Sequence, residues 1–214
     1  MKLFFHYCSY GFSNCYILGA EASDSEQNAN ETSQPTDAII IDPGSMDGKV
    51  LRTIENNNFN LRAALITHDH PHHVRGLQTL KRIYDAEIFG INQIIQEHKA
   101  TMVKDGNKIN IAGFDIEVIS IPGHSSDSAV YLVGAMLFTG DVLTAGLVGS
   151  TSSSYGAVTQ MNKLRGRLLS LPGDYIILPG HGPPSTLEAE RRFNTEIISF
   201  DQNKIRKPVF RVSH

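Results

Sequence analysis

The sequence has few cysteines, no long apolar stretch and no excess of positive charge. Two cysteines in 214 residues, Cys8 and Cys15, are too few for a disulfide scaffold, and we expect both to be buried thiols. No apolar run approaches the roughly 18 residues of a membrane-spanning helix, and residues 1–6 are too short for a signal peptide. A net charge of −3 offers no basic surface for nucleic acid. These absences predict a cytoplasmic protein with neither a membrane nor a nucleic-acid partner.

The sequence does contain alternating strand and helix patterns over the length of one domain, residues 1–214. The predicted strands include residues 14–18, 37–41, 61–67 and 114–121, and the predicted helices include residues 74–83, 91–98 and 158–169. A Ser-Thr-Leu-Glu sequence at residues 185–188 predicts a capping box at the start of the last helix. The pattern predicts a layered α/β domain in which two β-sheets lie between helices.

A polar insert at residues 21–36 interrupts this pattern. The segment has almost no apolar side chains to bury, so we expect a flexible loop there. The strands on either side are expected to pair with each other, so the insert is not predicted to be a linker between domains.

Four of the nine histidines lie in the segment HDHPHH at residues 68–73, directly after an apolar strand and before a helix. Side chains alternate along an extended chain, so His68 and His70 project to one side and can hold one metal ion. The proline between the two pairs turns the chain and lets His72 and His73 reach a second position nearby. Inside a core each imidazole would need partners for both ring nitrogens, so we interpret the cluster as a metal site.

Three more strand ends carry potential ligands next to glycine: His124, Asp141 and His181. Each one alone has a plain structural explanation, but together they add two imidazoles and one carboxylate at an edge that sheet packing brings together. The donors divide into a first set of His68, His70 and His124, a second set of His72, His73 and His181, and Asp141, which is able to bridge them. Donors of this kind predict two divalent metal ions, with zinc first and iron or manganese as alternatives.

The string THDHPHHVRG at residues 67–76 resembles the histidine signature of the metallo-β-lactamase superfamily, and His124, Asp141 and His181 follow in that family's order. Four further segments are similar to the short, single-domain type of the glyoxalase II (hydroxyacylglutathione hydrolase) branch: residues 12–15 (FSNC), 41–44 (IDPG), 140–143 (GDVL) and 179–183 (PGHGP). The resemblance implies a four-layer αββα sandwich of two mixed β-sheets flanked by helices.

The sequence departs from the family pattern at residue 72. His72 stands where the family has aspartate, so the second ion is held with one negative charge less. Asp69 does not replace that charge, because alternation points it away from the ligands, where it is expected to support the site or to cap the next helix. Glutathione specificity is not implied either, because the family's C-terminal helical domain has no counterpart in residues 203–214.

The resemblance implies a metal-dependent hydrolase, with a small-molecule thioester as substrate. Asp141 would hold both ions and orient a hydroxide nucleophile. The same ligands allow another reaction class, in which His68, His124 and Asp141 hold a single iron ion, as in the superfamily's persulfide dioxygenases. A metal-binding module without catalysis is the third interpretation.

Overall fold

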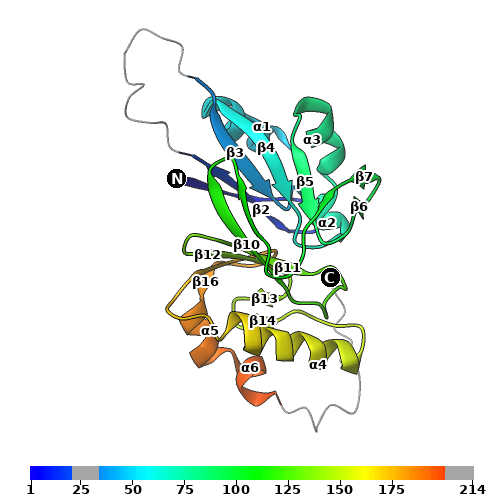
Figure 1. Cartoon of the computed structure of the whole chain (residues 1–214), viewed down its shortest axis with the longest axis vertical. Coiled ribbons are helices and arrows are strands. Elements are labelled where there is room, and N and C mark those ends of the chain that lie inside the picture. Colours follow the sequence, from blue (N-terminus) through cyan, green and yellow to red (C-terminus); the bar gives the residue numbers. More distant parts are fainter. Residues whose placement is uncertain (21–33, 201–214) are drawn as a thin grey trace.

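Two mixed β-sheets lie face to face, with helices on both outer sides (Figure 1). The computed structural model describes residues 1–20 and 34–200. In the first sheet the strand order is β1 (Lys2–Tyr7), β2 (Asn14–Gly19), β3 (Thr36–Ile41), β4 (Phe59–Leu65), β5 (Glu87–Gly90) and β8 (Thr101–Met102). In the second sheet the order is β16 (Ser185–Thr186), β15 (Ile176–Pro179), β12 (Met136–Gly140), β11 (Ala129–Val133), β10 (Phe114–Ser120) and β9 (Lys108–Ile111). Each sheet contains both parallel and antiparallel pairs.

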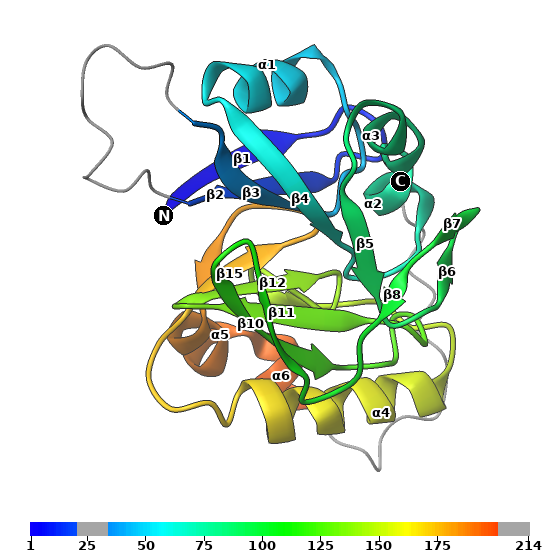
Figure 2. The same cartoon turned by 45° about the horizontal axis from the view of Figure 1, so that its top comes forward.

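Helices cover the outer face of each sheet. Those on the first sheet are α1 (Gly48–Asn56), α2 (Pro71–Val74) and α3 (Leu77–Ile83). Those on the second sheet, at the bottom in Figure 2, are α4 (Ser154–Lys163), the π-helical turn Leu164–Leu168, α5 (Leu187–Phe193) and α6 (Thr195–Ser199). This is the four-layer αββα sandwich that the sequence predicts. Within residues 1–20 and 34–200, no helix has the length and apolar content needed to cross a membrane.

The central strands are apolar on both faces because both faces are covered. In β2, Ile17 packs toward the helices of the first sheet, whereas Tyr16 and Leu18 pack toward the second sheet. In β3, Ile40 and Ile39 divide in the same way between the two sides. The apolar side chains therefore form three separate clusters, one between the sheets and one under each helical layer.

The ends of β4, β10, β12 and β15 meet at one edge of the sandwich. β12 and β15 are parallel, and β10 runs in the same direction because β10 and β12 are both antiparallel to β11. Two buried hydroxyl groups join the sheets there. The Tyr131 hydroxyl donates to the Ile66 carbonyl at 2.8 Å, and the Tyr16 hydroxyl donates to the Pro179 carbonyl at 2.7 Å. The strand ends of both sheets are thereby held at a fixed spacing.

The helix predicted for residues 91–98 is wrong, because this segment contains the antiparallel pair β6 (Ile94–Ile95) and β7 (His98–Lys99). Gln96 takes a left-handed conformation with φ of 51°, which turns the chain. Its backbone N–H donates to Asp69 Oδ2 at 3.1 Å instead of to a helical carbonyl. The isoleucine spacing imitates a helix, yet Ile94 is 63% exposed. A second short pair, β13 (Leu143–Thr144) and β14 (Leu147–Val148), follows β12.

Most of the predicted polar insert lies outside the described residues. Of residues 21–36, positions 21–33 are not described, so the flexibility expected there stays a prediction. Thr36 already belongs to β3, where it pairs with Phe59. The strand predicted at residues 37–41 therefore begins one residue earlier.

The start of α5 differs in detail from the predicted capping box. The helix α5 begins at Leu187, and its cap is Thr186, whose hydroxyl accepts from the Ala189 N–H at 3.2 Å. Ser185 belongs to β16, and its hydroxyl donates to Glu190. Glu188, which would complete the predicted box, instead pairs with Arg191 and Arg192.

Removing the Tyr131 hydroxyl should weaken the contact between the two sheets at this edge and destabilise the protein. The Tyr131→Phe variant deletes the buried donor to the Ile66 carbonyl, so we expect the free energy of unfolding in urea to fall by about 1–3 kcal/mol. Tyr155→Phe is the matched control, because the Tyr155 side chain is 82% exposed and its variant should stay within about 0.5 kcal/mol of the wild type. Equal stability of the two variants would contradict the role assigned to Tyr131.

Candidate metal centre

The common edge brings the predicted donor residues together. One group of ligand atoms within 4.8 Å of one another comes from His68, His70, His124 and Asp141, and another comes from His68, His72, His73 and Asp141. His181 joins the second group through Asp141, because its Nδ1 lies 2.7 Å from Asp141 Oδ1. The structure thus places all the predicted donors at one site, with His68 in contact with both sets. Which of them bind a metal ion stays a prediction.

Asp141 lies at the centre of this cluster. Its Oδ2 lies 3.7 Å from His124 Nε2 and 3.8 Å from His68 Nε2. Its Oδ1 lies 2.7 Å from His181 Nδ1 and 3.5 Å from His73 Nε2. The two oxygens therefore face different histidines, which is the arrangement that a carboxylate bridging two cations requires.

Two glycines, Gly140 next to Asp141 in the chain and Gly180 next to it in space, let two backbone segments come close to Asp141. Gly140 has φ of +50°, and a Cβ at this position would lie 2.4 Å from Thr67 Oγ1. A Cβ at Gly180 would lie 2.4 Å from Asp141 Oδ1 itself. Both distances are too short for any side chain, so the Gly-Asp and Gly-His sequences are needed for the strand ends to meet.

Asp42 orients two of the histidines from behind. Its Oδ2 accepts from His73 Nδ1–H at 3.0 Å and from the Thr67 hydroxyl at 2.6 Å. Because Asp42 takes the hydroxyl hydrogen, Thr67 Oγ1 accepts from His68 Nδ1–H at 3.1 Å. In both rings Nε2 is then turned toward Asp141. The sequence analysis missed this role, although a carboxylate directly after the apolar strand 37–41 was the available signal.

Three ring nitrogens converge in a way that fits a metal ion. His70 Nδ1 lies 2.9 Å from His68 Nε2 and 3.1 Å from His124 Nε2. His124 Nδ1–H donates to the Ser150 carbonyl at 2.9 Å, so its Nε2 carries a lone pair, as His68 Nε2 does. His70 Nδ1 carries at most one hydrogen, so it can donate to only one of the two neighbouring nitrogens. The lone pair of the other nitrogen then faces His70 Nδ1 without a hydrogen between them. A cation bound by the three nitrogens removes this conflict.

His73 gives an independent indication of the same kind. Its ring is completely buried, and its Nε2 has no hydrogen-bond partner among the described residues. Burial lowers the pKa of His73, but the negative charges of Asp42 and Asp141 outweigh this effect and raise the pKa to about 10. A divalent cation in place of the Nε2 proton would keep these charges balanced and would use the unpartnered nitrogen.

Three further groups, His68, His70 and Asp141, are held in the protonation states that bind metals. Burial lowers the pKa values of His68 and His70, and the neighbouring imidazoles lower them further. Burial alone would raise the pKa of Asp141, but hydrogen bonds from the histidines, His181 first, hold it well below its usual value. His68 and His70 are therefore neutral imidazoles beside an ionised carboxylate.

Asp69, Cys8 and Cys15 lie outside both donor groups, as the sequence predicts. Asp69 accepts from the Gln96 N–H and supports the loop beside the site, but it does not cap the helix, because the cap residue of α2 is His70. Both cysteines are buried and free.

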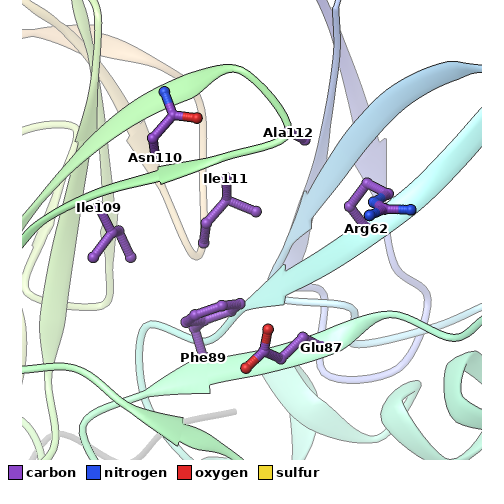
Figure 3. A pocket seen from close by; sticks show the side chains of 7 residues that line it. All are labelled: Arg62, Glu87, Phe89, Ile109, Asn110, Ile111 and Ala112. Atoms are coloured by element: carbon purple, nitrogen blue, oxygen red, sulfur yellow. The ribbon is translucent and has the colours of Figure 1, made fainter.

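A separate pocket of about 480 Å³ opens between the sheets (Figure 3). It is lined by Arg62, Glu87, Phe89, Ile109, Asn110, Ile111 and Ala112. Glu87 is the first residue of β5, and Ile111 is the last of β9. These positions lie at the opposite ends of the strands from the histidines, so the pocket is distinct from the metal centre, and we assign it no role.

Comparison with known sequences identifies the class of protein. Residues 31–181 match the family model described as the metallo-beta-lactamase superfamily, so the chain belongs to this superfamily. The "Hydroxyacylglutathione hydrolase GloC" of Haemophilus influenzae is 30% identical over 181 residues, which cover 73% of this chain and 85% of that protein.

Solved structures agree with the fold. ETHE1 from Myxococcus xanthus matches with a TM-score of 0.79 and 23% identity, covering 95% of this chain and 87% of its own. The protein TTHA1623, solved in a di-iron-bound form, matches with a TM-score of 0.70 and 24% identity, covering 90% of this chain and 98% of its own. At these identities the likeness shows the shared sandwich fold.

A divalent metal ion should stabilise the protein. An ion that binds only the folded state adds about 2.7 kcal/mol when its free concentration is 100 times the Kd, so zinc should raise the Tm of chelator-treated protein in calorimetry. His68→Ala removes a donor common to both groups and should abolish most of this rise. His98→Ala, which lies in neither group, should retain it. Equal rises in both variants would mean that zinc binds elsewhere.

Proposed function

We propose that this protein is a metal-dependent hydrolase that cleaves the thioester bond of a small-molecule substrate at a two-metal site. The observation that carries the proposal is the position of Asp141, whose two oxygens face histidines of both predicted sets at 2.7 to 3.9 Å. The name of the GloC relative, a hydroxyacylglutathione hydrolase, supports thioester chemistry.

The proposed ligands form two sets around Asp141, and His72 Nε2 approaches Oδ2, the oxygen that also faces His68 and His124. His68, His70 and His124 hold the first ion, His72, His73 and His181 hold the second, and Asp141 bridges them. The ring centroid of His181 lies 4.9 Å from that of His72 and 5.1 Å from that of His73, which supports these three histidines as ligands of one ion. Zinc is the proposed metal, with iron or manganese as alternatives that the same donors accept.

The protein itself orients the reacting groups and leaves one side of the site open to solvent. Bound metal ions lower the pKa of a coordinated water and polarise a substrate carbonyl. Asp141 stays ionised and orients the attacking group as an acceptor, while Asp42 keeps the Nδ1 proton of His73 on the far side of the ring. The side chains of His72 and His181 are 29% and 30% exposed, whereas His73 is completely buried. Substrate therefore approaches from the side of His72 and His181.

A second candidate is oxidation of a persulfide at a single iron ion. Both donor groups in the structure contain His68 and Asp141, so one ion could occupy the region between them. With His124, these residues form a face of two histidines and one carboxylate, which suits ferrous iron that keeps open positions for dioxygen and a thiol compound. The imidazole of His72 in place of a carboxylate favours this candidate, because it weakens the charge compensation of a second ion.

Elemental analysis of protein purified without added metal, combined with two activity assays, separates the candidates. Two ions of zinc, iron or manganese per chain together with thioester cleavage are the expected result. One iron per chain, with oxygen uptake on a persulfide and no thioester cleavage, would replace the hydrolase by the dioxygenase.

Loss of His181 should abolish hydrolysis without unfolding the protein. The side chain is 30% exposed, and within residues 1–20 and 34–200 its ring nitrogens bond to Asp141 and to the Gly11 carbonyl, so His181→Ala removes little of the core. We expect kcat/KM for a thioester to fall by more than about 100-fold, beyond the loss typical of residues behind the ligands. A Tm close to that of the wild type is the control, and full retained activity would refute the assignment of His181.

Restoring the carboxylate of the family pattern should tighten the second ion. His72 Nε2 lies 3.9 Å from Asp141 Oδ2, and His72→Asp adds a negative charge at this position. We expect the Kd of the weaker zinc ion to fall by about tenfold in equilibrium dialysis, because anionic donors compensate the charge of the cation. His72→Ala, which removes the donor altogether, should lower zinc content. Unchanged binding in both variants would show that residue 72 is not a ligand.

A further inference from the structure

A buried carboxylate outside the donor groups connects two segments that carry donors. Asp127 is only 7% exposed and follows His124 by three residues, in the loop between β10 and β11. Its Oδ2 accepts from the Asp69 N–H at 2.9 Å and from Asn92 Nδ2–H at 3.1 Å. Its Oδ1 accepts from the Ser125 hydroxyl at 2.5 Å. All three donors are uncharged, so the carboxylate is satisfied by hydrogen bonds.

Two of the three bonds reach the proposed ligands of the first ion, one from each side. Asp69 stands between His68 and His70 in the chain, and Ser125 is the direct neighbour of His124. A shift of either loop changes the gap between His70 Nδ1 and His124 Nε2, which is 3.1 Å. One carboxylate thus sets the spacing between a loop of the first sheet and a loop of the second.

Packing at this edge of the sandwich does not by itself explain why a carboxylate is buried at position 127. The two loops are already joined by the backbone bond from the Ala129 N–H to the Thr67 carbonyl at 2.8 Å. A buried carboxylate is costly, and an apolar side chain could fill the space without that cost. A side chain that holds the two loops in place through three hydrogen bonds has a use for this polar character.

We infer that Asp127 is a positioning residue for the first metal ion, setting the distance between the His68–His70 loop and His124. The inference rests on the proposed metal site. Asp127 is not itself a donor in either group, so its effect passes through the Asp69 backbone and the Ser125 hydroxyl.

Zinc affinity measured by competition with a chromogenic chelator tests this inference. Asp127→Ala should raise the Kd of one zinc ion by about 10–100-fold, the loss typical of groups that orient ligands. Asp127→Asn keeps the shape, can accept from Asp69 and can donate to Ser125, so it should restore the Kd to within a few-fold of the wild type. Ser125→Ala removes a single one of the three bonds and should weaken zinc binding in the same direction, by a smaller factor.

A matched control separates positioning from stability. Asp47 also accepts two backbone N–H groups, at the start of α1, so Asp47→Ala removes comparable bonds away from the histidines. It should lower the Tm while leaving the zinc Kd unchanged. If Asp127→Ala fails to fold, Ser125→Ala and Asp127→Asn carry the test.

The outcomes distinguish the two levels of the proposal. A wild-type Kd in Asp127→Ala or Ser125→Ala overturns the inference about Asp127 and leaves the metal-dependent hydrolase intact. A loss in Asp127→Asn equal to that in Asp127→Ala also overturns it, because hydrogen bonds would then not do the positioning. If the wild-type protein binds no zinc, iron or manganese, the proposed function fails together with the inference.

Discussion

The negative charge of Asp141 allows five imidazole rings to share one small volume. Its oxygens lie between 2.7 and 3.9 Å from nitrogens of His68, His72, His73, His124 and His181. Reaching that position depends on the whole sandwich, since the donors stand at strand ends of both sheets. The glycines before Asp141 and before His181 exist for the same reason, because any side chain there would collide with the site. Both the sandwich fold and the two glycines thus serve to place the Asp141 carboxylate among the imidazole rings.

The site is rigid on its inner side and open on its outer side. Asp42 fixes His73 directly and His68 through the Thr67 hydroxyl, and all of these groups are buried. His72 and His181 are partly exposed and belong to segments that border solvent. The geometry of the donor side chains is therefore determined from the interior, and the outer side is the one open to the proposed substrate. This division suits a hydrolase, which needs fixed metal ligands together with access for a substrate.

The donors could be predicted from sequence because their positions follow local rules. An apolar strand followed by HDHPHH puts imidazoles at a strand end whatever the rest of the chain does, and the glycine-flanked His124, Asp141 and His181 follow the same rule. The role of Asp42 behind the donors was missed: its place after an apolar strand marks it as a candidate, but its contact with His73, 31 residues away, arises only in the folded chain. The helix expected at residues 91–98 failed because its turn is stabilised by a distant partner, Asp69.

The spread of the donors along the chain has a consequence for synthesis. The first set and Asp141 are complete when about two thirds of the chain has left the ribosome, whereas the second set waits for His181. The β15 strand that ends before His181 pairs with β12 and brings the last ligand to Asp141. A growing chain can therefore form one of the two proposed metal positions before the other. Assembly of the proposed two-metal centre is coupled to the docking of β15, because that pairing brings His181 to Asp141.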